Sequence, residues 1–175
     1  MRNYISGVFY TEDEFKDIET NFNGKAEYDN GVVYLTPNTF DKHNIIMNNI
    51  NAYLSLYFRG KECRPYTDTE VIFKGGNDVK KFKPDIFVMP DGSDAPKIIF
   101  EIFSESTYKF KKAKYRTYEK YGVVEYNIVN LRSEVIVQYK LIDGSYQITN
   151  NLKKGDKYIS SIFKGLIIDT NFIFS

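Results

Sequence analysis

Two acidic residues interrupt stretches that are otherwise typical of buried strands. Glu101 lies inside IIFEIF (98–103), and Asp85 directly precedes the apolar part of KPDIFVMP (83–90). A short run of β-branched and aromatic residues predicts a strand that is buried on both faces. An unpaired, ionised carboxylate there would cost several kcal/mol of folding free energy. Glu101 must therefore be protonated, paired with a cation or turned towards a wet opening.

A cation for these acids is expected from the helix that follows the second strand. Residues 107–121 have helical periodicity, and Lys114 falls in their mostly aromatic, inward-facing stripe. Two interpretations remain open. Lys114 and Glu101 could form a structural salt bridge, or Asp85 and Glu101 could hold a divalent metal while Lys114 stabilises charge or orients a water.

The second interpretation has the parts that phosphodiester hydrolysis needs. Carboxylate oxygens bind hard ions such as Mg²⁺ or Mn²⁺, the ion polarises a phosphoryl oxygen and activates a water, and an ammonium offsets the developing negative charge. The chain has one histidine, His43, and one cysteine, Cys63. A zinc site built on cysteines and a Ser/Cys–His relay therefore have little material, so any metal is expected on carboxylates.

Composition and length set the broad class. A chain of 175 residues with 42% hydrophobic and 27% charged residues predicts a single globular domain over 1–175. No apolar stretch approaches the ~20 residues of a membrane span. The stretch MRNYISGVFYTEDEF lacks an apolar region followed by a cleavage site, so no signal peptide is expected. With a lone cysteine, these features favour a cytoplasmic location.

Basic residues are concentrated in one segment. Residues 107–120 hold six Lys and Arg against Glu119, a net charge of +5, whereas the rest of the chain sums to −4. Lys109, Lys111 and Lys112 are therefore candidates for nucleic-acid binding, the alternative being an ordinary solvated face.

The remaining pattern predicts a mixed β-sheet flanked by helices, that is, an α/β or α+β fold. Helices are expected at 11–20, 41–58 and 107–121, the last as a crossover between two strands. Asn30-Gly31 predicts the turn of a hairpin over 25–36. Gln138 and Lys140 are expected on a solvated strand face. Further strands are expected at 69–73, 84–89, 97–103, 124–129 and 134–141.

Three segments together resemble the Uma-type family of restriction endonucleases in the PD-(D/E)XK nuclease superfamily. They are PDIFV (84–88), EIFSEST (101–107) and KYRTYEKYGVVEYNIV (114–129). In that family a Pro-Asp strand precedes a Glu-x-hydrophobic-Ser strand, and a helix then supplies a Lys about four residues before a Tyr and eight before a Gly-Val pair. Lys114 and Tyr118 match that spacing.

The amino-terminal half extends the resemblance. AEYDNGVVYLTPNTFDKHNII (26–46) is similar to the family's Glu…Gly, Ser/Thr-Pro and His stretch, with Glu27, Gly31, Pro37 and His43 at the corresponding places. The superfamily's Lys two positions after the Glu is Phe103 in this chain, so the resemblance implies that Lys114 substitutes for it from the helix.

The resemblance implies a restriction-endonuclease-like core and Mg²⁺- or Mn²⁺-dependent hydrolysis of DNA. It assigns catalytic roles to Asp85, Glu101 and Lys114, with Glu27 as a third acid near the metal; the alternative for Glu27 is an exposed strand residue. His43 is interpreted as a satisfied structural group or a neighbour of a DNA phosphate. A homodimer is compatible with a duplex that has two strands to cut.

Two other functions stay open from the sequence. One is a non-catalytic nucleic-acid-binding or assembly module on the same fold, which the modest net charge of +1 keeps in view. The other is a structural acid–base network without a ligand. Fold alone does not choose among them, because function belongs to the site.

Overall fold

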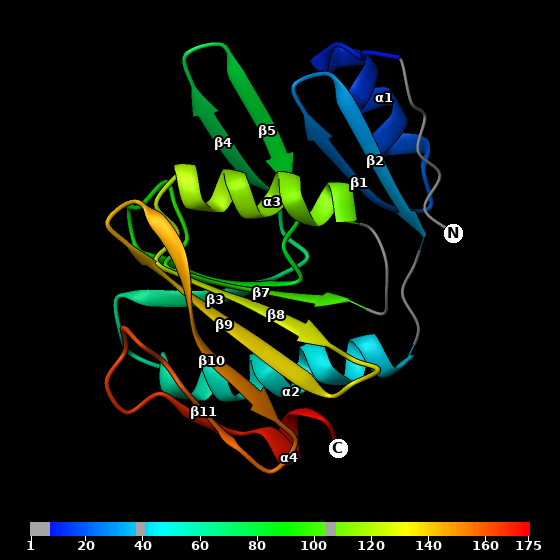
Figure 1. Ribbon diagram of the computed structural model, residues 1–175. Coiled ribbons are helices and arrows are strands. Elements are labelled where there is room, and N and C mark those ends of the chain that lie inside the picture. Colours follow the sequence, from blue (N-terminus) through cyan, green and yellow to red (C-terminus); the bar gives the residue numbers. More distant parts are fainter. Residues whose placement is uncertain (1–7, 38–40, 104–107) are drawn as a thin grey trace.

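The described residues form three β-sheets, of four, six and two strands, and a helix lies between the two larger sheets (Figure 1). The structure is a computed structural model that describes residues 8–37, 41–103 and 108–175, with the side chains of 108–110 excepted. Helix α3 (Tyr108–Lys120) lies between the sheets, and helix α2 (Asp41–Tyr57) lies on the far side of the larger one.

The sheet of four strands is antiparallel. Its order is β2 (Val32–Pro37), β1 (Gly24–Asp29), β5 (Asp78–Phe82) and β4 (Val71–Gly75). Asn30 and Gly31 join β1 to β2 with φ values of 48° and 92°, in the left-handed region that glycine adopts without strain and that asparagine tolerates better than most residues. Helix α1 (Glu12–Asn21) begins with the capping box predicted at Thr11 and packs Phe15 against one face of the sheet.

The larger sheet has six strands and is mixed. Strands β7 and β8 are parallel, and every other neighbouring pair is antiparallel. Helix α3 connects β7 to β8, which confirms the predicted crossover, and Gly122 (φ 77°) follows its last turn. The order is β10 (Ser145–Lys153), β9 (Val135–Ile142), β8 (Glu125–Asn130), β7 (Ile98–Phe103), β6 (Ile86–Pro90) and β3 (Cys63–Thr67).

The two faces of this sheet carry different cores. On one face α2 packs Ile46, Ile50 and Leu54 against β6 and β7, together with β11 (Lys157–Ile159), β12 (Ile167–Asp169) and α4 (Thr170–Ile173). On the other face α3 packs Tyr118 among aromatic residues of both sheets. The chain thus forms layers in which α3 is the shared inner element.

The predicted mixed sheet flanked by helices is confirmed, and all six residues of IIFEIF are buried. Strands β3 and β5 were not predicted, because CRPYT and DVKKF alternate too weakly to stand out. The expectation for Gln138 was wrong, since its side chain is fully buried. Among the described helices, none is long and apolar enough to cross a membrane.

Candidate active site

Asp85 and Glu101 come together because their strands pair. Strands β6 and β7 are antiparallel with Ile86 opposite Phe100, so Asp85, just before β6, lies at the level of Glu101. The Asp85 Oδ2 atom accepts a hydrogen bond of 2.7 Å from the backbone N–H of Ile102. The Asp85 carboxylate therefore takes the place of a backbone acceptor for β7 just beyond the end of the β6–β7 hydrogen-bond ladder. Both acids are almost fully buried.

Lys114 bridges two carboxylates from different sheets. Its Nζ lies 2.8 Å from Glu101 Oε1 on β7 and 2.8 Å from Glu27 Oε1 on β1. The Tyr118 hydroxyl, one turn later on α3, donates to Glu101 Oε1 at 2.7 Å. The inward orientation predicted for Lys114 is confirmed, and its partners are two acids rather than one. Glu27 is fully buried, so the interpretation of an exposed strand residue is wrong.

A second lysine, Lys25, holds Asp85. Its Nζ lies 2.6 Å from Asp85 Oδ1 and 2.6 Å from Asp68 Oδ1. His43, at the start of α2, places Nε2 3.4 Å from Asp85 Oδ2. The side chain of Asp68 is 47% exposed and that of Lys25 is 15% exposed. The acid cluster therefore meets solvent on the Lys25–Asp68 side, while the Lys114 side is closed.

Burial and charge push the two strand acids in opposite directions. Burial raises the pKa of Glu101 to about 7; Lys114 opposes this shift, and the nearby charges of Asp85 and Glu27 add to it. Burial would also raise the pKa of Asp85, but the attraction of Lys25 and the contact with His43 outweigh it and hold that pKa below its usual value. Asp85 is thus ionised at neutral pH, and Glu101 is near its titration point.

The same balance acts on Lys25. Burial by itself lowers the pKa of a lysine, but the charges of Asp85, Glu27 and Glu101 raise the pKa of Lys25 above its ordinary value. Lys25 therefore stays charged and serves as the counter-ion of an acid-rich cluster.

The donor set fits a hard divalent ion, but the lysines separate the donors. Glu27 Oε2 is buried and has no hydrogen-bond partner among the described residues, which leaves a carboxylate oxygen open to a cation. In the part of the chain that the structure describes, no three acidic, His or Cys side chains converge in a ready metal site. Lys25 stands at Asp85 Oδ1, so an ion there would take the place of its ammonium.

The predicted nucleic-acid contacts on α3 differ from one another. Lys112 is exposed, whereas Lys111 is partly buried with Nζ 4.3 Å from the centre of the Phe103 ring. The side chain of Lys109 lies outside the described residues. His43, the other candidate, lies on α2, where it is buried against Asp85. The basic stretch is therefore not one uniform face.

Two members of the cluster were missed from the sequence, Lys25 and Asp68. A signal for Lys25 existed, because residues 25 and 27 alternate on one strand and so share a face with Glu27. Asp68 follows β3, a strand that was not predicted, and its approach to Asp85 depends on the pairing of β3 with β6. No local pattern marks it.

Comparison with known proteins places the chain in a family. The chain matches the Uma2 family model, described as "putative restriction endonuclease", over residues 12–171. The chain belongs to that family, and the resemblance drawn from the sequence is confirmed. A comparison with curated proteins finds no match.

A solved structure shares the fold. It is the crystal structure of a "putative nuclease" belonging to DUF820 from Anabaena variabilis ATCC 29413, with a TM-score of 0.70 and 17% sequence identity. The match covers 94% of this chain and 97% of that one, so the likeness of fold extends over nearly the whole of both chains.

Proposed function

We propose that this protein is a metal-dependent nuclease that hydrolyses DNA phosphodiester bonds, with Mg²⁺ or Mn²⁺ as its cofactor. The observation that carries the proposal is the cluster of Glu27, Asp85 and Glu101, buried and held by two lysines from different elements. Membership of the Uma2 family and the fold shared with the Anabaena protein support it.

Asp85 and Glu101 would hold the ion, with Glu27 completing the set of acids. Bound there, a divalent ion would polarise a phosphoryl oxygen and lower the pKa of a water molecule. Asp85 is ready for this role because its pKa is already low, and its orientation is fixed by the Ile102 N–H. Tyr118 fixes one oxygen of Glu101 in the same way.

Lys114 would supply positive charge beside the phosphate as negative charge develops on it. Its ammonium is almost completely buried and held by two carboxylates, so it is oriented before any substrate arrives. Substrate would approach from the Lys25–Asp68 side, where the cluster reaches solvent. Lys25 would then release Asp85 and face the phosphate backbone.

The rival function is a non-catalytic nucleic-acid-binding or assembly module. Its support is the ion pairing itself, since every acid of the cluster already has an ammonium within 2.8 Å. In that case Glu101 and Lys114 would be a buried structural pair, and removing either would cost about 3–5 kcal/mol of stability.

A cleavage assay combined with thermal melts separates the two. Glu101→Gln, Lys114→Ala and their double mutant are tested on plasmid and oligonucleotide DNA with Mg²⁺ or Mn²⁺, beside Asp94→Asn, which changes an exposed acid in a loop. We expect each single mutant to stay folded and lose about 10³-fold in rate, and the double mutant to lose little more. Two results together would support the non-catalytic module instead: the wild type does not cleave DNA, and the metal-free single mutants lose much of their stability.

A further inference from the structure

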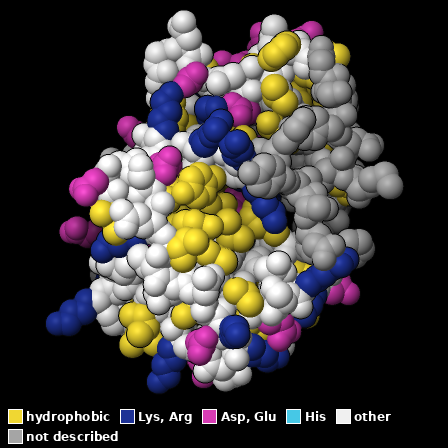
Figure 2. Space-filling view, viewed as in Figure 1, with side chains coloured by type: hydrophobic (Ala, Val, Ile, Leu, Met, Phe, Trp, Pro, Cys, Tyr) yellow, Lys and Arg dark blue, Asp and Glu magenta, His cyan; other side chains and the backbone are white. Residues whose placement is uncertain are grey.

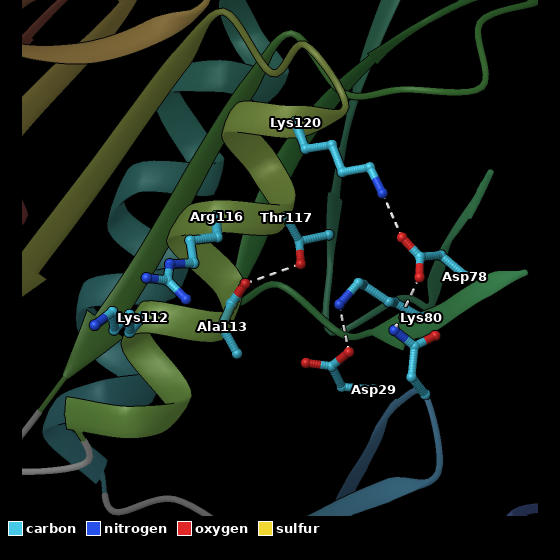
Figure 3. A pocket seen from close by; sticks show the side chains of 9 residues that line it. Asp29, Asp78, Lys80, Lys112, Ala113, Arg116, Thr117 and Lys120 are labelled. Carbon is cyan, nitrogen blue, oxygen red and sulfur yellow. Dashed lines mark hydrogen bonds and ion pairs between the residues drawn. The ribbon is translucent and has the colours of Figure 1, made fainter. Parts of the chain in front are cut away.

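A pocket lies between α3, the β1–β2 turn and β5 (Figure 3). Its volume is about 400 Å³. It is separate from the acid cluster but adjacent to it, because Glu27 and Asp29 are two residues apart on one face of β1, about 7 Å along the strand. The charged side chains that line it are Asp29, Asp78, Lys80, Lys112, Arg116 and Lys120.

The acids of this pocket are already neutralised. Lys80 forms an ion pair with Asp29, and Lys120 forms one with Asp78. Asn30 adds a hydrogen bond from its Nδ2 to Asp78 Oδ1 at 3.3 Å. Each acid thus has its own cation, and the pocket keeps an excess of positive charge.

That excess comes from Lys112 and Arg116. Both are exposed, and among the described residues neither has an ion-pair or hydrogen-bond partner. They are four residues apart on α3, so their side chains start about 6 Å apart on successive turns. In Figure 3 both extend on the same side of the helix, away from Asp29 and Asp78, and so stand at one edge of the pocket. An ammonium and a guanidinium fork in this arrangement suit the oxygens of one phosphate group.

We propose that this pocket binds a phosphate group, with Lys112 and Arg116 as its main contacts. The inference rests on the proposed function, since the backbone of bound DNA is the natural source of such a phosphate; free phosphate shares the same chemistry. Basic side chains gather over α3 on this face of the molecule (Figure 2). On β1 the pocket lies beyond Glu27 from Lys25, so a strand held there would extend past the acid cluster to the opening at Lys25 and Asp68.

The test compares two double mutants with equal charge changes. Lys112→Gln/Arg116→Gln removes the pocket cations, and Lys157→Gln/Lys164→Gln removes exposed lysines from β11 and the loop before β12. Fluorescence anisotropy measures the binding of 12-nucleotide single-stranded and duplex DNA in EDTA, which excludes cleavage, over a range of salt. Thermal melts with inorganic phosphate form the second arm.

We expect the pocket mutant to bind DNA about tenfold more weakly and to lose about one unit of the salt slope, while the control changes much less. Phosphate should raise the melting temperature of the wild type and the control but not of the pocket mutant. A phosphate effect without a change in DNA binding would assign the pocket to a free phosphate ligand. Equal behaviour of both mutants in both arms would overturn the proposal. If the pocket binds DNA but the protein shows no metal-dependent cleavage, the proposed nuclease function is wrong and the phosphate-binding pocket is still supported.

Discussion

Two buried glutamates on neighbouring strands of the same sheet have opposite surroundings. Glu101 on β7 faces α3, and Glu125 on β8 faces the layer of α2 and β11, since Glu125 pairs with Ile98 and Glu101 with Ile128 across the parallel ladder. Both are at most 2% exposed. Their difference lies in the groups that satisfy them.

Glu125 is surrounded by neutral donors. It accepts hydrogen bonds from the hydroxyls of Tyr158, Ser160 and Ser161, and from the Ser161 backbone N–H at 2.7 Å. Glu101 instead shares one ammonium with Glu27 and lies near a third acid, Asp85. The hydrogen bonds to Glu125 thus come from neutral groups of the fold, whereas the charge of Glu101 is balanced by the ammonium of Lys114. We infer that Glu125 stabilises the fold and that Glu101 serves the site.

Neutralising each glutamate should reveal this contrast most strongly. Glu125→Gln should lower the free energy of unfolding by about 3–5 kcal/mol, because the amide turns an N–H towards groups that themselves donate. Glu101→Gln should cost far less at pH 7.5, because it removes an acid from an acid-rich cluster. Urea denaturation of both mutants measures the difference. Equal losses would mean that both carboxylates are structural.

The next largest expected effect is a difference between the wild type and Glu101→Gln in how stability depends on pH. The pKa of Glu101 is raised from 4.5 to about 7, so between these values the folded state binds a proton that the unfolded state does not. Stability from this group is therefore complete below pH 4.5 and falls as pH rises to 7, by on the order of 3 kcal/mol. The wild type should lose this amount relative to Glu101→Gln in melts from pH 4.5 to 7.5. A constant difference between the two proteins over that range would contradict the raised pKa.

The smallest expected effect is a change in metal affinity when Lys25 is replaced. It tests whether the Lys25 ammonium competes with a divalent ion. That ammonium occupies Asp85 Oδ1 at 2.6 Å, so Lys25→Met should strengthen Mn²⁺ binding by about tenfold, roughly 1.4 kcal/mol, by removing a competitor. Lys42→Met, which breaks an exposed pair with Glu134, is the matched control. Calorimetric titration measures both. Weaker binding in Lys25→Met would show that the lysine supports the ion rather than competing with it.

The features of the Glu101 site that depend on local sequence pattern could be predicted from the sequence. The apolar run around Glu101 predicted its buried strand, and the helical stripe predicted the inward direction of Lys114. Both follow from side-chain periodicity, which the sequence carries directly.

The missed parts depend on contacts between distant segments. Gln138 lies opposite Asn127 on the face covered by β11, where its amide donates to the Ile159 carbonyl at 3.0 Å. The alternation along β9 shows that Gln138 shares a face with Ile136, but not that a later strand covers it. Asp68 joins the cluster through the pairing of β3 with β6 in the same way. Such partners become visible only when the sheet order is known.

We propose that a divalent ion displaces the Lys25 ammonium from the cluster that contains Asp85. Thermal melts of the metal-free protein with increasing Mn²⁺ or Mg²⁺ test it without any assumption about substrate. The melting temperatures of the wild type and Asp94→Asn should rise by roughly 5–10 °C at an ion concentration of 100 times the dissociation constant. The melting temperature of Asp85→Asn should not change. An equal rise in Asp85→Asn would remove Asp85 from the site and contradict the account.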